Sequence, residues 1–313
     1  MNAAFARTIG VSVMLFSIVW LFDASGSSRK GQEASPRTKD AGAETMLPAS
    51  TKTILHDLPK TEPITLPDAS SVPEIEAVVY GAWDIESGRV LLAHRTTEAW
   101  PIASLTKLLT ATVALTHIPP ATHISFIHHT DPSDNAHLSL LPSGEYRVAD
   151  LVETMLIASD NGSAEALVEV LGREAFLREM MRLASSWGMS ETHVADPTGL
   201  SIENRSTGEN LVILVRRVWE EFPEIFEITR GVGLNIETIK GNEVRIASTH
   251  EFAGESDFLG GKTGYTQASK GNLISLFLVH NRPIMVLVLG AEDRFLATSK
   301  LRDWIKANTR ITP

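Results

Sequence analysis

The chain has 313 residues, of which 43% are hydrophobic and 21% charged, and it contains no cysteine. This length supports one large domain or two small ones with a sizeable core. The lack of cysteine excludes disulfides, thiolate metal sites and a lipidated N-terminal cysteine. The net charge of −10, without a long basic run, argues against nucleic acid as a partner.

The N-terminal part of the chain differs in composition from the rest. Arg7 and the α-amine precede an apolar stretch, Ile9 to Phe22, which has the length of a signal-peptide core and is short for a transmembrane helix. We expect residues 1–23 to be a signal peptide or an N-terminal signal anchor. Ala24-Ser25-Gly26 matches a cleavage site poorly, so removal and retention both stay open. Residues 24–72 are polar and predict a disordered linker, which leaves 73–313 as the globular domain.

The globular domain opens with two strand-like runs, 75–84 and 89–94, joined by a turn at Glu86-Ser87-Gly88. Apolar residues then recur at helical spacing from Ile102 to Val113, which predicts a helix that begins near Ser104. An irregular polar region is expected over 122–144. Its histidines show no metal-binding spacing and are interpreted as loop residues, so no metal site is expected. They are His123, His128, His129 and His137.

A block of helices follows, and then more strands. Amphipathic patterns predict helices over residues 148–158, 164–171, 176–184 and 211–222, the last capped by Ser206 or Thr207. A turn at 196–200 precedes the last of these helices, and a less regular stretch follows it after Phe222. Strands over 273–280 and 284–289, joined at 281–283, come next. Glu292 and Asp293 open a closing helix that we expect to pack on the sheet through Phe295, Leu296, Trp304 and Ile305. This order indicates an α+β fold with a mostly antiparallel sheet and segregated helices.

Ser104 and Lys107 lie one turn apart in the first predicted helix, so their side chains occupy one face within reach of each other. A serine hydroxyl is a poor nucleophile at neutral pH, and a nearby amine can accept its proton if burial lowers the lysine pKa. Ser27 and Lys30 repeat the S-x-x-K spacing in the linker, so the spacing alone is weak evidence. An exposed helix lysine is the alternative interpretation.

Two further polar motifs follow. Ser159-Asp160-Asn161 stands between two predicted buried helices, where polar side chains can point into a cleft from a rigid support. Ser133-Asp134-Asn135 repeats the tripeptide in the irregular region, and either copy could act only as a helix cap or turn; position favours Ser159. In Gly260–Thr266, small residues flank Lys262 and allow close approach of a ligand, as on the edge strand of a cleft.

S-x-x-K, S-x-N and K-T-G in this order are the signature of penicillin-recognising acyl-transfer enzymes. In this interpretation Ser104 attacks a carbonyl and becomes acylated, and Lys107 takes its proton. Ser159 and Asn161 then supply a proton relay and hydrogen bonds to a substrate amide.

The third motif completes this interpretation. Lys262 and Thr263 offer a positive charge and a hydroxyl donor to a substrate carboxylate, with Gly264 beside them. The backbone N–H groups of Ser104 and Tyr265 could form the oxyanion hole.

With these motifs the chain resembles the bacterial D-alanyl-D-alanine carboxypeptidases, the low-molecular-mass penicillin-binding proteins. The matching stretches lie between about residues 73 and 310: 101–107, 141–151, 159–161, 196–201, 206–207 and 261–266. The resemblance implies a β-lactamase/transpeptidase-like fold, in which helices and an all-helical subdomain flank a five-stranded antiparallel sheet. It also implies serine acyl transfer on peptidoglycan stem peptides and covalent inhibition by β-lactams. No cofactor is expected, and the N-terminal segment predicts export to the periplasm or the extracytoplasmic face of a bacterial membrane.

Three departures from the family pattern stand out. Asp160 replaces the usual glycine of S-x-N and is more typical of class A β-lactamases, and Ser269-Lys270 replaces an Ala-Gly pair after K-T-G. Many members continue into a C-terminal β domain with a membrane anchor, whereas this sequence stops at Pro313 after the closing helix. Any contact with a membrane is therefore expected through the N-terminal segment.

Several functions stay open beside a carboxypeptidase that releases terminal D-Ala. An endopeptidase of the same family would cut D-Ala-containing cross-links, and the motifs do not separate the two. A β-lactamase needs a carboxylate to activate the deacylating water, for which Asp196-Pro197 and Phe222-Pro223-Glu224 are the candidates. A non-catalytic wall-binding protein is the last alternative.

Overall fold

The computed structural model describes residues 64–65, 72–128, 139–237, 241 and 243–311. The predictions for residues 1–23, for most of the linker, for Ser27 and Lys30, for His129 and His137, and for Ser133-Asp134-Asn135 lie outside this part of the chain. Within it, we find no helix that combines the length and the hydrophobicity needed to span a bilayer.

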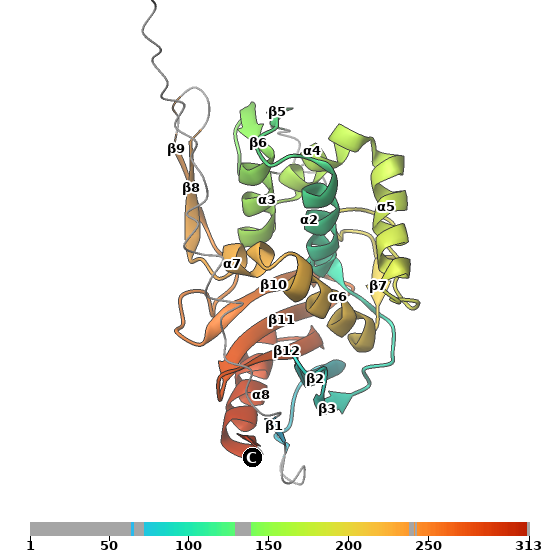
Figure 1. Ribbon diagram of the computed structural model, residues 1–313, viewed down its shortest axis with the longest axis vertical. Helices are drawn as coiled ribbons and strands as arrows, with labels where there is room; N and C mark the ends of the chain where they lie inside the picture. Colours follow the sequence, from blue (N-terminus) through green and yellow to red (C-terminus); the bar gives the residue numbers. More distant parts are fainter. Residues whose placement is uncertain (1–63, 66–71, 129–138, 238–240, 242, 312–313) are drawn as a thin grey trace, which may run out of the picture. The chain divides into compact units, whose positions relative to one another are not determined.

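A five-stranded antiparallel sheet forms the centre of the described domain, in the order β10-β11-β12-β2-β3 (Figure 1). Nearly every residue of β11 and β12 is buried, which explains their continuous apolar sequence. β10 carries K-T-G and forms one edge. The strands are β2 (Val79–Asp84), β3 (Val90–His94), β10 (Phe258–Thr266), β11 (Lys270–Val279) and β12 (Arg282–Ala291).

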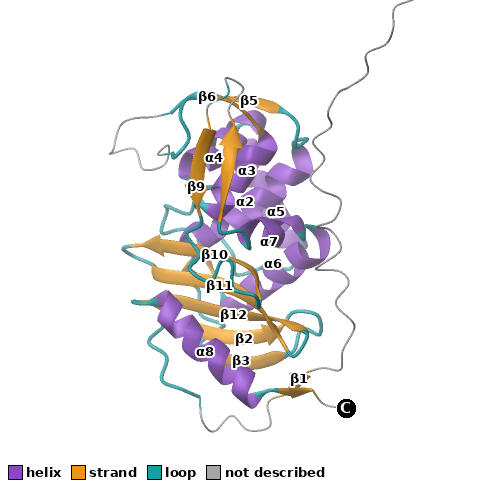
Figure 2. Cartoon of the chain, turned by 90° about the vertical axis from the view of Figure 1, so that its left-hand side faces the viewer, coloured by secondary structure: helices purple, strands orange, loops and turns teal. Residues whose placement is uncertain are grey.

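Helices cover both faces of this sheet. The closing helix α8 lies across one face, where its Leu301 and Ile305 join a core with Phe277 of β11 (Figure 2). The other helices share a larger core on the opposite side, and α2 to α5 gather beyond the β10 edge (Figure 1). The helices are η1 (Ala103–Leu105), α2 (Thr106–His117), α3 (Val148–Ile157), α4 (Asn161–Leu171), α5 (Arg173–Ser186), α6 (Gly208–Glu221), α7 (Glu224–Thr229) and α8 (Arg294–Asn308).

Four short antiparallel pairs complete the described secondary structure: β1 (Ile64–Thr65) with β13 (Arg310–Ile311), β4 (Trp100–Pro101) with β7 (Arg205–Ser206), β5 (His123–Phe126) with β6 (Gly144–Arg147), and β8 (Gly233–Glu237) with β9 (Glu243–Ala247). The α+β prediction, with an antiparallel sheet and segregated helices, is confirmed. Thr207, rather than Ser206, caps α6 by accepting a hydrogen bond from the Asn210 N–H.

Parts of two regions expected to be irregular form strands or helices among the described residues. In β5 the ring of Phe126 is buried and meets Tyr146 of β6 edge-on, with 5.9 Å between ring centroids. This contact across the pair gives a short, otherwise polar segment a reason to form a strand. After Phe222 the chain forms helix α7 and the β8–β9 hairpin.

Three boundaries or contacts also differ from the prediction. The first strand begins at Val79 rather than Ile75. The turn between β11 and β12 consists of His280 and Asn281, both at positive φ, so that Arg282 already belongs to β12. Leu296 is 53% exposed, because it lies on the outer face of the first turn of α8 and not on the sheet.

Candidate active site

Ser104 lies in the short helical turn η1, directly before α2, so the chain becomes helical near Ser104 as predicted and α2 itself begins at Thr106. Ala103 has a positive φ of 49°, which is uncommon for a residue with a side chain and marks a sharp turn. The Thr106 hydroxyl secures the turn by donating to the Ala103 carbonyl at 2.8 Å. From the sheet, the Asn272 amide donates to the Pro101 carbonyl at 2.8 Å.

The Lys107 amino group is the centre of the site. The side chain is fully buried, and its Nζ lies 3.0 Å from Ser104 Oγ, 2.7 Å from Asn161 Oδ1 and 2.7 Å from the Thr198 carbonyl oxygen. These oxygens belong to the first motif, the second motif and the turn at 196–200. Residues far apart in the sequence thus converge on one amine.

Burial lowers the pKa of Lys107 to about 7. Asp160, Asp196 and Glu165 oppose this shift through their negative charges. At neutral pH a large fraction of Lys107 is therefore uncharged, as a general base that takes a serine proton must be.

The Asp196 carboxylate organises the turn that supplies the Thr198 carbonyl. It accepts hydrogen bonds from the Thr198 hydroxyl at 2.6 Å and from the backbone N–H groups of Thr198, Gly199 and Ser201 at 2.7–2.8 Å. Burial raises the pKa of Asp196, but these hydrogen bonds outweigh it and leave the pKa below its usual value. The carboxylate is thus occupied within the turn.

Two features hold this turn against the nucleophile. Gly199 has a φ of 88°, and a side chain there would overlap the Ala103 carbonyl, so only glycine fits. The buried Asn204 side chain accepts from the Asp196 N–H and donates to Thr106 Oγ1 and the Asp196 carbonyl. Sequence reasoning identified neither group: Asn204 reaches the turn through tertiary contacts that no residue spacing encodes, and the Thr198 carbonyl is a backbone acceptor, which carries no signal in residue type.

In the second motif, Asn161 is the first residue of α4 and reaches Lys107, whereas Ser159 adopts a φ of 60° in the turn before it. Within the described residues no hydrogen bond joins the Ser159 hydroxyl to Ser104 or Lys107. Its role as a proton relay therefore stays a prediction.

Asp160 has a structural task at this position. Its carboxylate caps α4 by accepting from the Ser163 N–H at 2.7 Å and also accepts from the Leu140 N–H at 2.7 Å and the Ser139 hydroxyl at 2.8 Å. The departure from glycine in S-x-N thus ties the segment at 139–141 to the catalytic turn.

The third motif lies on β10, at the edge of the sheet as predicted. Gly264 brings the strand against the nucleophile turn, since a Cβ there would lie 3.3 Å from the Ser104 nitrogen and 3.0 Å from the Ile102 oxygen. The strand that carries Lys262, Thr263, Gly264 and Tyr265 thus lies against the turn that holds Ser104. The Tyr265 side chain is exposed.

Lys262 has a different environment from Lys107. It is buried, and its Nζ donates to the Thr263 carbonyl at 3.0 Å, but no ion pair with a carboxylate forms within the described residues. Burial lowers the pKa of Lys262 well below its usual value, and the positive charges of Lys107 and Arg294 lower it further. The site therefore lacks negative charge at this point.

Arg294 is a cationic residue that sequence reasoning missed. It begins α8, and its guanidinium Nη1 lies 3.5 Å from the Gly264 carbonyl oxygen. Its buried Nε has no hydrogen-bond partner among the described residues. Two cationic side chains thus converge on K-T-G, although Arg294 follows the motif by a hairpin and could not be placed there by spacing.

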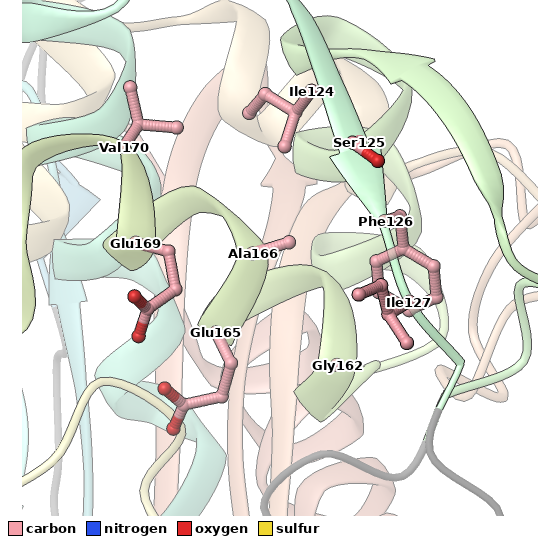
Figure 3. Close-up of a pocket in the computed structure, with 9 residues that line it drawn as sticks. All are labelled: Ile124, Ser125, Phe126, Ile127, Gly162, Glu165, Ala166, Glu169 and Val170. Atoms are coloured by element: carbon pink, nitrogen blue, oxygen red, sulfur yellow. The ribbon is translucent and has the colours of Figure 1, made fainter. Parts of the chain in front are cut away.

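A pocket of about 440 Å³ adjoins the second motif without containing the nucleophile (Figure 3). Ile124, Phe126 and Ile127 line one side of it, and Glu165 and Glu169 project from α4 on the other. Gly162, the neighbour of Asn161, forms one end. None of the residues predicted from the motifs lines this pocket.

Comparison with known proteins agrees with this geometry. Residues 67–293 match the D-alanyl-D-alanine carboxypeptidase family. The chain belongs to this family. It is 26% identical to a D-alanyl-D-alanine endopeptidase of Escherichia coli, over 76% of this chain and 79% of that protein. It is 25% identical to a D-alanyl-D-alanine carboxypeptidase of Mycobacterium tuberculosis, over 70% of this chain and 76% of that protein.

Among solved structures, the fold is similar to that of penicillin-binding protein D2 from Listeria monocytogenes in its cefotaxime-bound form. The TM-score is 0.67 at 27% identity, over 75% of this chain and 98% of that one. The resemblance inferred from the three motifs is thus confirmed, and the protein is a serine peptidase of the D-alanyl-D-alanine carboxypeptidase family.

Ser269-Lys270, which stands where the family usually has an Ala-Gly pair, also has a local structural role. The Ser269 hydroxyl accepts from the Thr266 N–H at 3.0 Å and closes the turn between β10 and β11. Lys270 has a positive φ of 56° there and pairs with Glu292 at 3.1 Å.

Proposed function

We propose that the protein is a D,D-carboxypeptidase that removes terminal D-Ala from peptidoglycan stem peptides through an acyl-enzyme on Ser104. The observation that carries this proposal is the buried Lys107 amine, whose neighbours are the Ser104 hydroxyl and two neutral oxygens and which forms no carboxylate ion pair within the described domain. A lysine in an ordinary structural ion pair would stay charged and could not take a proton.

The hydrogen bonds of a neutral Lys107 amine account for the acylation step. A neutral amine has two N–H donors and one lone pair. The donors serve Asn161 Oδ1 and the Thr198 carbonyl, and the lone pair then faces Ser104 Oγ. Ser104 attacks the carbonyl carbon of the penultimate D-Ala while Lys107 takes its proton. The carbon–nitrogen bond breaks, the proton passes to the leaving amine, and water later hydrolyses the ester.

Recognition of the substrate rests on the K-T-G strand. The free carboxylate of the terminal D-Ala supplies the negative charge that Lys262 lacks, and Thr263 offers it a hydroxyl donor. The N–H groups of Ser104 and Tyr265 are proposed to bind the oxyanion, and Ser159 to relay the proton to the leaving group. This mechanism uses no metal or cofactor.

An endopeptidase is the second candidate, because the similar proteins include enzymes named for each activity. The β-lactamase alternative has less support. Asp196 was one candidate for the water-activating carboxylate, and its carboxylate is occupied by donors within its own turn. A binding protein without chemistry would have no need of a buried neutral amine beside a serine.

The site of action is proposed to be extracytoplasmic, since the family acts on the cell wall. Residues 1–23 would direct export, as a cleaved signal peptide or as an anchor. The proposed ligands are peptidoglycan stem peptides and, as covalent inhibitors, β-lactams.

Products from defined substrates would test the proposal. The full chain is incubated with pentapeptide monomers and with cross-linked dimers, and products are followed by mass spectrometry. We expect loss of one alanine from monomers, absent in Ser104→Ala. Cleavage of dimers alone would replace the carboxypeptidase with an endopeptidase, and no change in either substrate would overturn both.

A further inference from the structure

Thr249 connects the second and third motifs. It lies in the segment between β9 and β10, and its Oγ1 is 2.8 Å from Oγ1 of Thr263 in K-T-G. Both its N–H and its hydroxyl point to the Ile157 carbonyl, at 3.0 and 3.2 Å. Ile157 ends α3 two residues before Ser159. One side chain thus touches the catalytic strand and the helix end that leads to S-x-N.

The protons on these hydroxyls can be counted. Each threonine hydroxyl has one proton to donate and two lone pairs to accept with. If Thr249 donates to the Ile157 carbonyl, its short contact with Thr263 requires Thr263 to donate to Thr249. The Thr263 proton is then directed away from any ligand in the carboxylate site.

A bound carboxylate needs a hydrogen bond from the Thr263 hydroxyl, and the geometry allows this hydroxyl to turn away from Thr249. When Thr263 turns its proton to the carboxylate, Thr249 can rotate and donate to the Thr263 oxygen. The Ile157 carbonyl keeps its hydrogen bond from the Thr249 N–H at 3.0 Å. Every group is satisfied in both arrangements, and the chain of two hydroxyls polarises the one that faces the anion.

We propose that Thr249 is a positioning residue that acts through Thr263. In the empty site its hydroxyl accepts a hydrogen bond from the Thr263 hydroxyl, and once a carboxylate binds it donates a hydrogen bond to Thr263. This inference rests on the proposed role of Thr263 in carboxylate recognition. It goes beyond the three motifs, in which residue 249 has no place.

The burial pattern makes the proposal testable by substitution. Thr263 is only 4% exposed, whereas the Thr249 side chain is exposed, so replacing Thr249 leaves the core intact. Thr249→Val removes the hydroxyl at nearly constant shape, and Thr249→Ser restores it. Thr97, another exposed threonine in the segment between β3 and β4, provides a matched control as Thr97→Val.

A double-mutant cycle on the full chain would test it, with the second-order rate of acylation by benzylpenicillin, which carries a carboxylate, as the readout. Thr249→Val should slow acylation about threefold to tenfold, the worth of one hydrogen bond, with Thr249→Ser and Thr97→Val near wild type. In a Thr263→Val background, Thr249→Val should have no further effect.

Two results would overturn the inference alone, given a wild type that acylates normally. One is an equal effect of Thr249→Val in both backgrounds, which would show that Thr249 does not act through Thr263. The other is no effect in the wild-type background, or none that serine restores. A wild type that penicillin does not acylate would instead overturn the proposed function, and this inference with it.

Discussion

The site holds two buried lysines, one on helix α2 and one on strand β10, and their surroundings differ in kind. On the helical side, Lys107 meets three oxygens from three separate segments, and acidic residues partly restore its pKa, to about 7. On the sheet side, the Lys262 ammonium group donates, within the described residues, to the carbonyl of its neighbour Thr263 alone, and the nearby charges that act on its pKa are positive.

The difference explains how one residue type can serve two tasks. The Lys107 amine has three hydrogen-bond partners from the protein before any substrate binds. This suits a base that must be held in place and lose its charge near neutral pH. Lys262 is a donor without an anionic partner in the described domain, which suits a subsite completed by a substrate carboxylate. Three substitutions and two pH dependences test this contrast.

The largest effect is expected from Lys107→Ala. Without the base, acylation of Ser104 by penicillin should slow about 10³-fold or more while the fold survives. Stopped-flow acylation and circular dichroism measure the two, with Lys300→Ala on α8 as control. Normal acylation kinetics in Lys107→Ala would contradict the base role.

Lys262→Ala should weaken recognition rather than chemistry. Loss of a charge-assisted contact predicts a fall in kcat/KM of about 10- to 100-fold for peptides with a free C-terminal carboxylate. The fall should appear mainly in KM, and the same peptide amidated at its C-terminus should lose little. If both peptides were affected equally, Lys262 would not be the carboxylate partner.

Asp196→Asn should act on the Lys107 side indirectly. An amide cannot accept all the donors that converge on this carboxylate, so the turn that supplies the Thr198 carbonyl should loosen. We expect acylation to slow about tenfold and the free energy of unfolding to fall by about 1–3 kcal/mol. The exposed Asp303→Asn on α8 is the control. A β-lactamase base would instead leave acylation intact and abolish turnover of the acyl-enzyme.

Replacing Asp196 should also change how the free energy of unfolding depends on pH. Because its folded pKa is below the usual value, ionised Asp196 stabilises the fold above about pH 4, and this contribution is lost on further acidification. Unfolding of Asp196→Asn should therefore depend less on pH in the acid range than unfolding of the wild type.

The contrast also shows which parts of the site the sequence could predict. Ser104 and Lys107 are one helical turn apart, so local geometry alone joins them. The Thr198 carbonyl, Asn204 and Arg294 reach the site through tertiary contacts, and no residue spacing encodes these. The same limit applies to the fold: long apolar strands such as β12 were predictable, whereas the β8–β9 hairpin, held by pairing between mixed residues, was not.

The pH dependence of acylation tests the central claim about Lys107 most directly. The acylation rate constant of the full chain is measured at saturating benzylpenicillin from about pH 5 to 9. Because Lys107 must be neutral to accept the Ser104 proton, the rate should rise about tenfold per pH unit in the acid range and level off above about pH 7. A rate that does not change with pH, or that still rises steadily at pH 9 as for a lysine with the ordinary pKa of 10.5, would contradict the account.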